Sequence, residues 1–376
     1  MTRTIRARSQ THADGRDLDA GTGYVLVELL IAAALVCTVI AVLLRFCATA
    51  QASVRTAGDS TDLQQRLRVA VEALRRDLLA AGAGLSNGSP SAPLIDAFPP
   101  ILPARTGITG SDPEASFFAD RITVLFVPDD GSQTRLANRM VGVSGPLVID
   151  PGAPGCASDG TCGFRAGDRV LIYAPEAGDG ARDIVTLSAV DPASSSLVPA
   201  AALSRAYAAG SRVATLVQRV YYFDRAGKRL MVYDGDRSDV PLVDHVVKLR
   251  FTYYADPSPT SITPPAEGLS NCAYAAGTPP VPLLSDLGGT NLVPLTETQL
   301  TDGPWCGPSP GRFDVDLLRV RRIGVALRLE AEGADFRGTG AAFANRGTSV
   351  VGDRYIPDLQ ITFEVAPRNL LNTGMR

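Results

Sequence analysis

The most informative stretch of this sequence is GTGYVLVELLIAAALVCTVIAVLLRF (Gly21–Phe46). From Val25 to Leu44 it is apolar except for Glu28 and Thr38, and a helix of that length spans about 30 Å, enough to cross a bilayer. The carboxylate needs an explanation of its own, because an unpaired acid inside a bilayer costs about 3 kcal/mol or more and usually marks a function.

Two ordinary interpretations account for the apolar run but not for the acid. A secretory signal peptide could be cut near ATAQA (Ala48–Ala52), yet its apolar region is usually only about 7–15 residues long. A plain membrane anchor is oriented by the basic residues before it, which are Arg3, Arg6, Arg8 and Arg16. The positive-inside rule then predicts one pass, with a cytoplasmic N-terminus and the C-terminal part outside.

The order of glycine, carboxylate and apolar run resembles the prepilin signal of type IV pilins and pseudopilins. The resemblance implies that a prepilin peptidase cuts after Gly23, so that residues 1–23 form a cytoplasmic leader peptide. It also implies that the new N-terminal residue, Tyr24, is N-methylated, and that Glu28 is the carboxylate of the signal. The sequence departs from the family at Tyr24, where Phe is usual, and at Val25, where Thr is common.

Glu28 has a physical role in that interpretation. In a packed filament it can neutralise the α-amino group of Tyr24 on a neighbouring subunit, so that two charges in apolar surroundings become one pair. The alternative is an interfacial Glu28 whose side chain reaches the lipid headgroups and has no partner.

Helical periodicity continues beyond the apolar run. Apolar residues recur every three or four positions on one stripe, at Leu63, Leu67, Ala70, Val71, Leu74 and Leu78. Gly82 and Gly84 then favour a helix end. We therefore predict one long helix over residues 24–84, with a transmembrane segment over 25–46 and a second half that packs on a sheet.

Residues 85–376 are predicted to form a β-rich head after a connector rich in Pro, Ser and Gly. One N-terminal helix followed by strands indicates an α+β fold with a half-buried antiparallel sheet. The strands are expected in RITVLFV, DRVLIYA, DIVTLSAV, VQRVYYFD, KRLMVY, VVKLRFTYY, RRIGVALRLEA and LQITFEV. Residues 163–214 are expected to form a small inserted β subdomain, and residues 256–310 a long loop.

Charged residues in these elements give two further expectations. Asp77 is too close in sequence to Arg75 and Arg76 to share a helix face with them, so we expect it to contact the sheet. Arg321 and Arg322 interrupt the alternation of their strand, which indicates a bulge or an edge; an edge could bind a partner.

The six cysteines divide by position. Cys37 and Cys47 lie in or beside the apolar run, whereas the other four lie beyond it. Four cysteines outside the membrane fit two disulfides in an oxidising compartment, and we expect Cys156 with Cys162 and Cys272 with Cys306, because each pair closes a local loop. A zinc site is the alternative, although no Cys-x-x-Cys spacing is present.

No motif in the sequence points to catalysis. The net charge of −3 argues against a nucleic acid as the main partner, and two histidines leave little for a His-based metal site or triad. No P-loop or His-Glu-x-x-His motif is present. Asp234, Asp236 and Asp239 could bind calcium but lack the glycine and the distal Glu of an EF-hand loop, so a solvated turn is the preferred interpretation. We expect no enzyme, cofactor or metal.

The succession of helix end, Tyr-rich hairpin and closing strands resembles the PilW-like minor pilins of type IV pili. The resemblance implies a type IV pilin-like fold and a minor pilin that helps to initiate or cap a filament, with the prepilin peptidase, other minor and major pilins, the inner-membrane assembly platform and membrane lipid as partners. It implies a bacterial inner-membrane location followed by the pilus at the cell surface. A minor pseudopilin of type II secretion and a membrane-anchored periplasmic binding domain remain alternatives.

Overall fold

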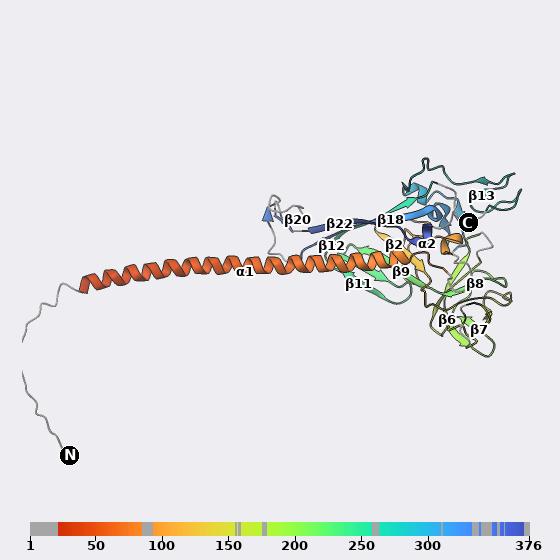
Figure 1. Ribbon diagram of the computed structural model, residues 1–376, viewed down its shortest axis with the longest axis horizontal. Coiled ribbons are helices and arrows are strands. Elements are labelled where there is room, and N and C mark those ends of the chain that lie inside the picture. The colour runs from red at the N-terminus through yellow and green to blue at the C-terminus, as the bar shows by residue number, and fades with distance from the viewer. Residues whose placement is uncertain are drawn as a thin grey trace, which may run out of the picture. The chain divides into compact units, whose positions relative to one another are not determined.

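The computed structural model describes residues 22–84, 93–154, 156, 159–174, 179–257, 262, 264–309, 311–332, 338–339, 348–351, 354–356 and 358–371 (Figure 1). The chain divides into two compact units, residues 1–60 and 61–376. The predicted leader lies outside the described residues except for its last two, which belong to helix α1 (Thr22–Ala80).

The first unit contains, among its described residues, only the first part of α1. The segment Val25–Ala48 is long and apolar enough to span a membrane, and none of it is buried. This range contains the predicted transmembrane segment 25–46. An exposed helix of this composition is compatible with a single membrane pass.

The second unit begins with the last part of α1, whose apolar stripe packs on the head. Leu63, Ala70, Leu74 and Leu78 are buried, and Leu67 packs against the same core. The helix ends at Ala80 because Gly82 takes a left-handed conformation (φ 77°), and its N–H donates to the backbone oxygen of Leu125. The predicted helix end is therefore confirmed to within a few residues.

Two antiparallel sheets carry the main core with this helix. The five-stranded sheet has the order β1 (Ile101–Leu102), β2 (Arg121–Phe126), β9 (Val217–Asp224), β10 (Arg229–Tyr233) and β11 (Asp239–Val243). The four-stranded sheet has the order β15 (Val293–Pro294), β12 (Val246–Ala255), β18 (Val320–Glu330) and β22 (Asp358–Val365). One continuous core cluster includes Leu74 of α1, Ile122 of β2, Phe251 of β12 and Val325 of β18.

The predicted strands are found in these sheets. β9 and β10 form the expected hairpin, with Asp224 opposite Arg229. On β18 the expected inward residues Ile323, Val325, Leu327 and Leu329 are all fully buried. On β12 the alternation is correct from Leu249 onward, but Val247 is displaced because the register shifts between Val246 and Lys248.

Between β2 and β9 the chain forms a separate six-stranded sheet. Its order is β3 (Gln133–Arg135), β8 (Arg212–Thr215), β5 (Arg169–Tyr173), β6 (Arg182–Asp191), β7 (Ser196–Pro199) and β4 (Leu147–Val148). It has its own apolar cluster, which includes Phe164, Ile172 and Val213. The sheet already begins at Gln133, whereas the sequence placed the insertion at 163–214; β3 and β4 are too short to show an alternating pattern.

Residues 256–310 are not a structureless loop. Their described part contains β13 (Tyr274–Ala275), β14 (Val281–Pro282), β15, the 3-10 helix η3 (Thr298–Leu300) and β16 (Trp305–Cys306). The remaining elements are η1 (Leu94–Asp96), β17 (Phe313–Asp314), η4 (Val315–Arg319), β19 (Gly338–Thr339), β20 (Thr348–Val351), β21 (Arg354–Ile356) and α2 (Arg368–Leu371). The fold is α+β with an N-terminal apolar helix and antiparallel sheets, and strands dominate it.

Candidate functional site

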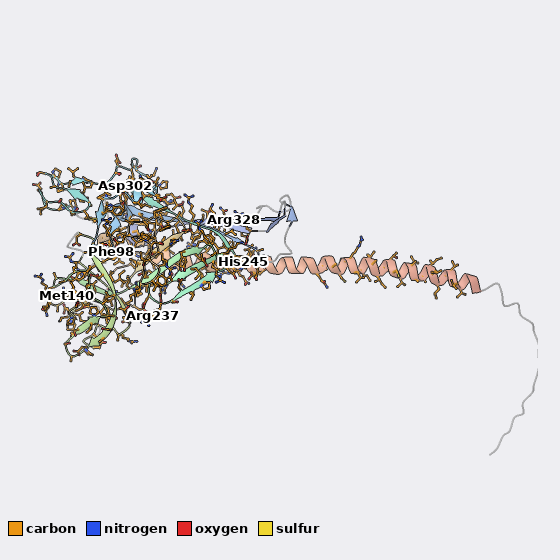
Figure 2. All side chains as sticks on the ribbon, turned by 180° about the vertical axis from the view of Figure 1, so that it is seen from behind. Phe98, Met140, Arg237, His245, Asp302 and Arg328 are labelled. Atoms are coloured by element: carbon orange, nitrogen blue, oxygen red, sulfur yellow. A yellow bond between two sulfur atoms is a disulfide. The ribbon has the colours of Figure 1, made fainter. Side chains whose placement is uncertain are left out.

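The apolar half of α1 is the first candidate site. Every side chain described between Val25 and Ala48 is exposed, and Figure 2 shows these side chains standing away from the helix. Glu28 and Arg45 are the charged residues of this segment, one near each end. A carboxylate on an exposed apolar helix needs either the lipid–water interface or a partner on another chain.

Gly23 and Tyr24 lie in the first turn of α1. Tyr24 and Glu28 are four positions apart, which places them one helical turn from each other on the same face. The backbone therefore brings the predicted cleavage position, methylation position and carboxylate together at the start of one helix. Cleavage, methylation and the charge pairing of Glu28 stay predictions.

Asp77 connects the end of α1 to the five-stranded sheet. Its carboxylate is 4% exposed and accepts a 2.7 Å hydrogen bond from the hydroxyl of Tyr221 on β9. It also pairs with Arg76 at 2.9 Å, and Arg219 lies 3.8 Å away. The expected contact with the sheet is confirmed. The exclusion of Arg76 was wrong, because its long side chain reaches the neighbouring carboxylate although the two do not share a helix face.

Two cysteine pairs form disulfides in the head. Cys156 joins Cys162 with 4.1 Å between their Cα atoms, and Cys272 joins Cys306 with 5.2 Å. These are the pairs that loop closure suggested; the Cα distance of Cys272–Cys306 lies in the usual range for a disulfide, and that of Cys156–Cys162 is slightly shorter. Among the described residues, Cys37 and Cys47 are the free cysteines, and both are exposed on the apolar part of α1.

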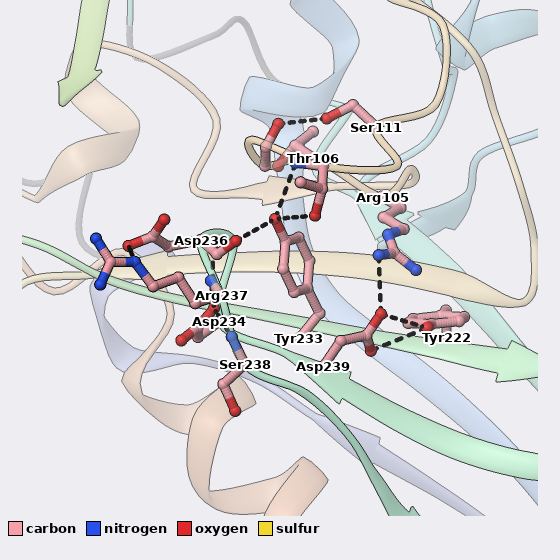
Figure 3. Close-up of polar contacts among 12 residues, drawn as sticks. Arg105, Thr106, Ser111, Tyr222, Tyr233, Asp234, Asp236, Arg237, Ser238 and Asp239 are labelled. Atoms are coloured by element: carbon pink, nitrogen blue, oxygen red, sulfur yellow. Dashed lines mark hydrogen bonds and ion pairs between the residues drawn. The ribbon is translucent and has the colours of Figure 1, made fainter. Parts of the chain in front are cut away.

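In the acidic turn after β10, the carboxylates of Asp234 and Asp239 accept hydrogen bonds from other groups of the protein (Figure 3). Asp234 accepts backbone hydrogen bonds from Asp236, Arg237 and Ser238 at 2.8, 3.0 and 3.0 Å. Asp239 instead pairs with Arg105 at 2.9 Å and accepts from the Tyr222 hydroxyl.

No group of three His, Cys, Asp or Glu side chains among the described residues is arranged to hold a metal ion. The preferred interpretation of the Asp-rich segment, a turn, matches this geometry. Burial raises the pKa of Asp234, but the three backbone donors outweigh burial and leave the pKa below its ordinary value.

The paired arginines sit at a bulge of the inner strand β18. Tyr254 faces Arg322 while Ala255 faces Val320, so Arg321 is the extra residue, as the broken alternation indicated. Arg321 is buried and donates to the backbone oxygens of Leu318 and Val320. β18 lies between β12 and β22, but β22 pairs only with its Ile323–Glu330 part, so the alternative of a partner-binding edge at the two arginines stays a hypothesis.

A cleft in the head was not foreseen from the sequence. It has a volume of about 330 Å³ and lies where the connector 102–116, the start of β6 and the segment 311–317 meet. Its walls combine apolar side chains such as Leu125, Ile184 and Phe313 with charged ones. No local pattern marks these residues, because they come from distant parts of the chain.

Comparisons with protein-family models, with curated proteins and with solved structures found no match to this chain.

Proposed function

We propose that this protein is a PilW-like minor pilin that acts in the assembly or initiation of a type IV pilus. The observation that supports this most is the single helix α1, which joins two different segments. Val25–Ala48 is apolar and exposed and carries Glu28, whereas the last turns are buried against the head. A helix of this kind can insert in a membrane or filament core while its other end holds a folded domain.

Glu28 supplies the assembly contact in this proposal. Cleavage after Gly23 creates a positive α-amine on Tyr24, and the amine needs a negative partner once the helix leaves the lipid interface. Glu28 of a neighbouring subunit provides that partner, so the pair forms only when the two subunits are in register. The protein has no catalytic role in this proposal, and its partners are the prepilin peptidase, other pilins and the inner-membrane assembly platform.

The size of the head favours a place at the filament tip. The head carries two disulfides and an inserted sheet beyond the helix and its two main sheets. Repeated packing along a shaft leaves little room for such a head, whereas one copy at the tip meets no such limit. Regular occurrence of the protein along the length of sheared pili would contradict this part of the proposal.

The mature N-terminus tests the proposal directly. Mass spectrometry of the protein isolated from the membrane is expected to find a chain that begins with methylated Tyr24, and this form should disappear when the prepilin peptidase is deleted. Replacing Gly23 by Leu should block processing, whereas Gly21→Leu, two residues earlier, should leave it intact. A chain that keeps Met1 or starts at Gln51 would refute the prepilin interpretation.

Two alternatives make different predictions for the same cells. A minor pseudopilin of type II secretion has the same processed N-terminus, but its deletion abolishes protein secretion and leaves pili intact. A membrane-anchored periplasmic binding domain keeps its uncleaved N-terminus and affects neither process. The cleft in the head is the observation that favours a binding role, and such a role is compatible with a pilin as well.

A further inference from the structure

The cleft contains a cation whose hydrogen-bonding capacity is not used. Arg182 begins β6 and lines the cleft, and its buried Nη1 atom has no hydrogen-bond partner among the residues that the structure describes. Its guanidinium carbon lies 4.7 Å from the ring centre of Phe98 and 5.4 Å from that of Phe313. Two aromatic faces thus hold the guanidinium in place but offer its N–H groups no acceptor.

The other charged residues that line the cleft are engaged elsewhere. Asp183 accepts hydrogen bonds from Ser204 and Tyr207. Asp112 pairs with Arg121, and Glu114 accepts from Ser309 and Gly311.

The remaining charged residues of the lining are also engaged in other contacts. Asp314 accepts the backbone N–H groups of Gly303 and Asp316. Arg169 donates to the backbone oxygen of Asp234 and to Gln218. Arg312, the third arginine of the lining, is exposed and lies over the ring of Trp305. Arg182 is therefore the cation that a ligand inside the cleft would meet.

The charge of Arg182 persists in this setting. Burial lowers its pKa to about 10, which still leaves the guanidinium protonated at neutral pH. A buried cation with an unpaired N–H is unfavourable by itself, and an anion that reaches it removes that penalty. A carboxylate suits it best, because its two oxygens match the fork of a guanidinium.

The walls near Arg182 define the rest of the ligand. Leu125, Ile184, Phe313 and Leu317 line the same cleft, so the part of a ligand behind its anionic group meets an apolar surface. A volume of about 330 Å³ is in the range of small-molecule sites. We propose that this cleft binds a carboxylate that carries a short apolar group, with Arg182 as the anchor of the carboxylate.

Such a carboxylate can be a small organic acid or the C-terminus of a peptide. The test uses the full chain in lipid nanodiscs and labelled hexanoate, with empty nanodiscs as the blank for lipid partition. We expect saturable binding of hexanoate and none of hexanol, which has the same apolar group without the charge. An apolar tripeptide with a free C-terminus, compared with its C-terminal amide, is then tested as a competitor.

Variants locate the site. Arg182→Met should weaken hexanoate binding at least tenfold. Arg182→Lys keeps the charge but loses the fork of the guanidinium, so its affinity for hexanoate should lie between those of the unchanged protein and Arg182→Met. Arg237→Met removes an exposed arginine outside the cleft lining and should leave binding unchanged. Circular dichroism and unfolding curves show that each variant is folded, and the comparison of hexanoate with hexanol needs no variant.

The outcomes are distinct. Competition by the free peptide but not by its amide supports the proposal with a peptide terminus as the source; no competition by either peptide, with hexanoate still bound, supports it with a small acid. The proposal is wrong if hexanoate does not bind saturably, if hexanol binds equally well, or if Arg182→Met binds hexanoate like the unchanged protein. None of these results depends on processing at Gly23.

Discussion

The hydroxyl of Tyr221 donates a 2.7 Å hydrogen bond to the carboxylate of Asp77, which fastens the last turns of α1 to β9. Burial and the nearby carboxylate raise the pKa of Tyr221 above its ordinary value, so the phenol stays a neutral donor. Tyr221→Phe should therefore leave the buried carboxylate short of a partner and lower the free energy of unfolding by about 1–3 kcal/mol.

Urea unfolding followed by the fluorescence of Trp305, the single tryptophan, measures this loss. Tyr222→Phe is the matched control, because the Tyr222 hydroxyl contacts the more exposed Asp239 and not Asp77. Tyr222→Phe should lower the free energy of unfolding by less than Tyr221→Phe does. Equal unfolding free energies for Tyr221→Phe and the unchanged protein would show that Arg76 alone satisfies Asp77.

The two disulfides should contribute unequally to stability. The Cys272–Cys306 bond closes a sequence separation of 34 residues and the Cys156–Cys162 bond one of 6. Loop-closure entropy then predicts losses of about 4 kcal/mol and about 2 kcal/mol when each pair is replaced by alanines. Unfolding midpoints of the two double variants check the order, and Cys37→Ala with Cys47→Ala, which removes the two free cysteines, should have no effect on the head. A larger loss from the shorter loop would contradict the entropic account.

The elements that the sequence predicted are those with a long repeating pattern. The apolar stripe from Leu63 to Leu78 and the alternation from Ile323 to Leu329 each extend over several periods, so that single exceptions do not hide them. Even the bulge at Arg321 was visible, because one extra residue reverses the faces of a strand.

The features that escaped prediction depend on contacts between distant segments. β3 and β4 are too short to carry a pattern and exist because neighbouring strands pair with them. At the cleft, the fold places Arg182 of β6 over the rings of Phe98 and Phe313, which lie far apart in the chain. Neither contact follows from local periodicity, and Arg182 by itself reads as an ordinary surface arginine at the start of a strand.

The turn after β10 should depend on Asp234 and not on calcium. Asp234→Ala removes the acceptor of three backbone N–H groups and should cost about 1–2 kcal/mol of unfolding free energy. Asp236→Ala is the control, because the Asp236 carboxylate accepts none of these three backbone hydrogen bonds and faces the exposed Arg237 at 3.7 Å. Added calcium should leave the unfolding midpoint unchanged. A calcium-dependent rise that Asp234→Ala abolishes would instead identify a metal site.

Protonation of Asp314 should stabilise the head in mild acid, and the Asp314→Asn variant should lack this stabilisation. Burial raises the pKa of Asp314 from 3.8 to about 6, so between these values the folded chain binds a proton that the unfolded chain does not. The raised pKa of Asp314 therefore adds to the free energy of unfolding. This contribution is complete below about pH 3.8 and is lost as the pH rises through about 6.

The stability difference between the unchanged protein and Asp314→Asn should therefore grow in favour of the unchanged protein as the pH falls from about 7 to about 5. Other acids, such as Asp150 and Asp234, have lowered pKa values and also make stability depend on pH. Both proteins share these acids, so their effect cancels in the difference. Glu267→Gln, at an exposed acid that does not contribute to the shift of Asp314, should follow the pH profile of the unchanged protein. Parallel profiles for the unchanged protein and Asp314→Asn would refute the shift.

Glu28 should be needed for incorporation into a filament but not for insertion into the membrane. Under the proposed function, Glu28→Ala removes the partner of the Tyr24 amine on a neighbouring subunit, while it makes the segment Val25–Ala48 more apolar and easier to insert. Membrane fractionation and immunoblots of sheared pili measure the two steps separately. Thr38→Ala is the matched control, because the Thr38 hydroxyl bonds within its own helix, to the backbone oxygen of Leu35, and needs no partner on another chain. Equal incorporation of Glu28→Ala and Thr38→Ala would mean that the acid only marks the lipid interface.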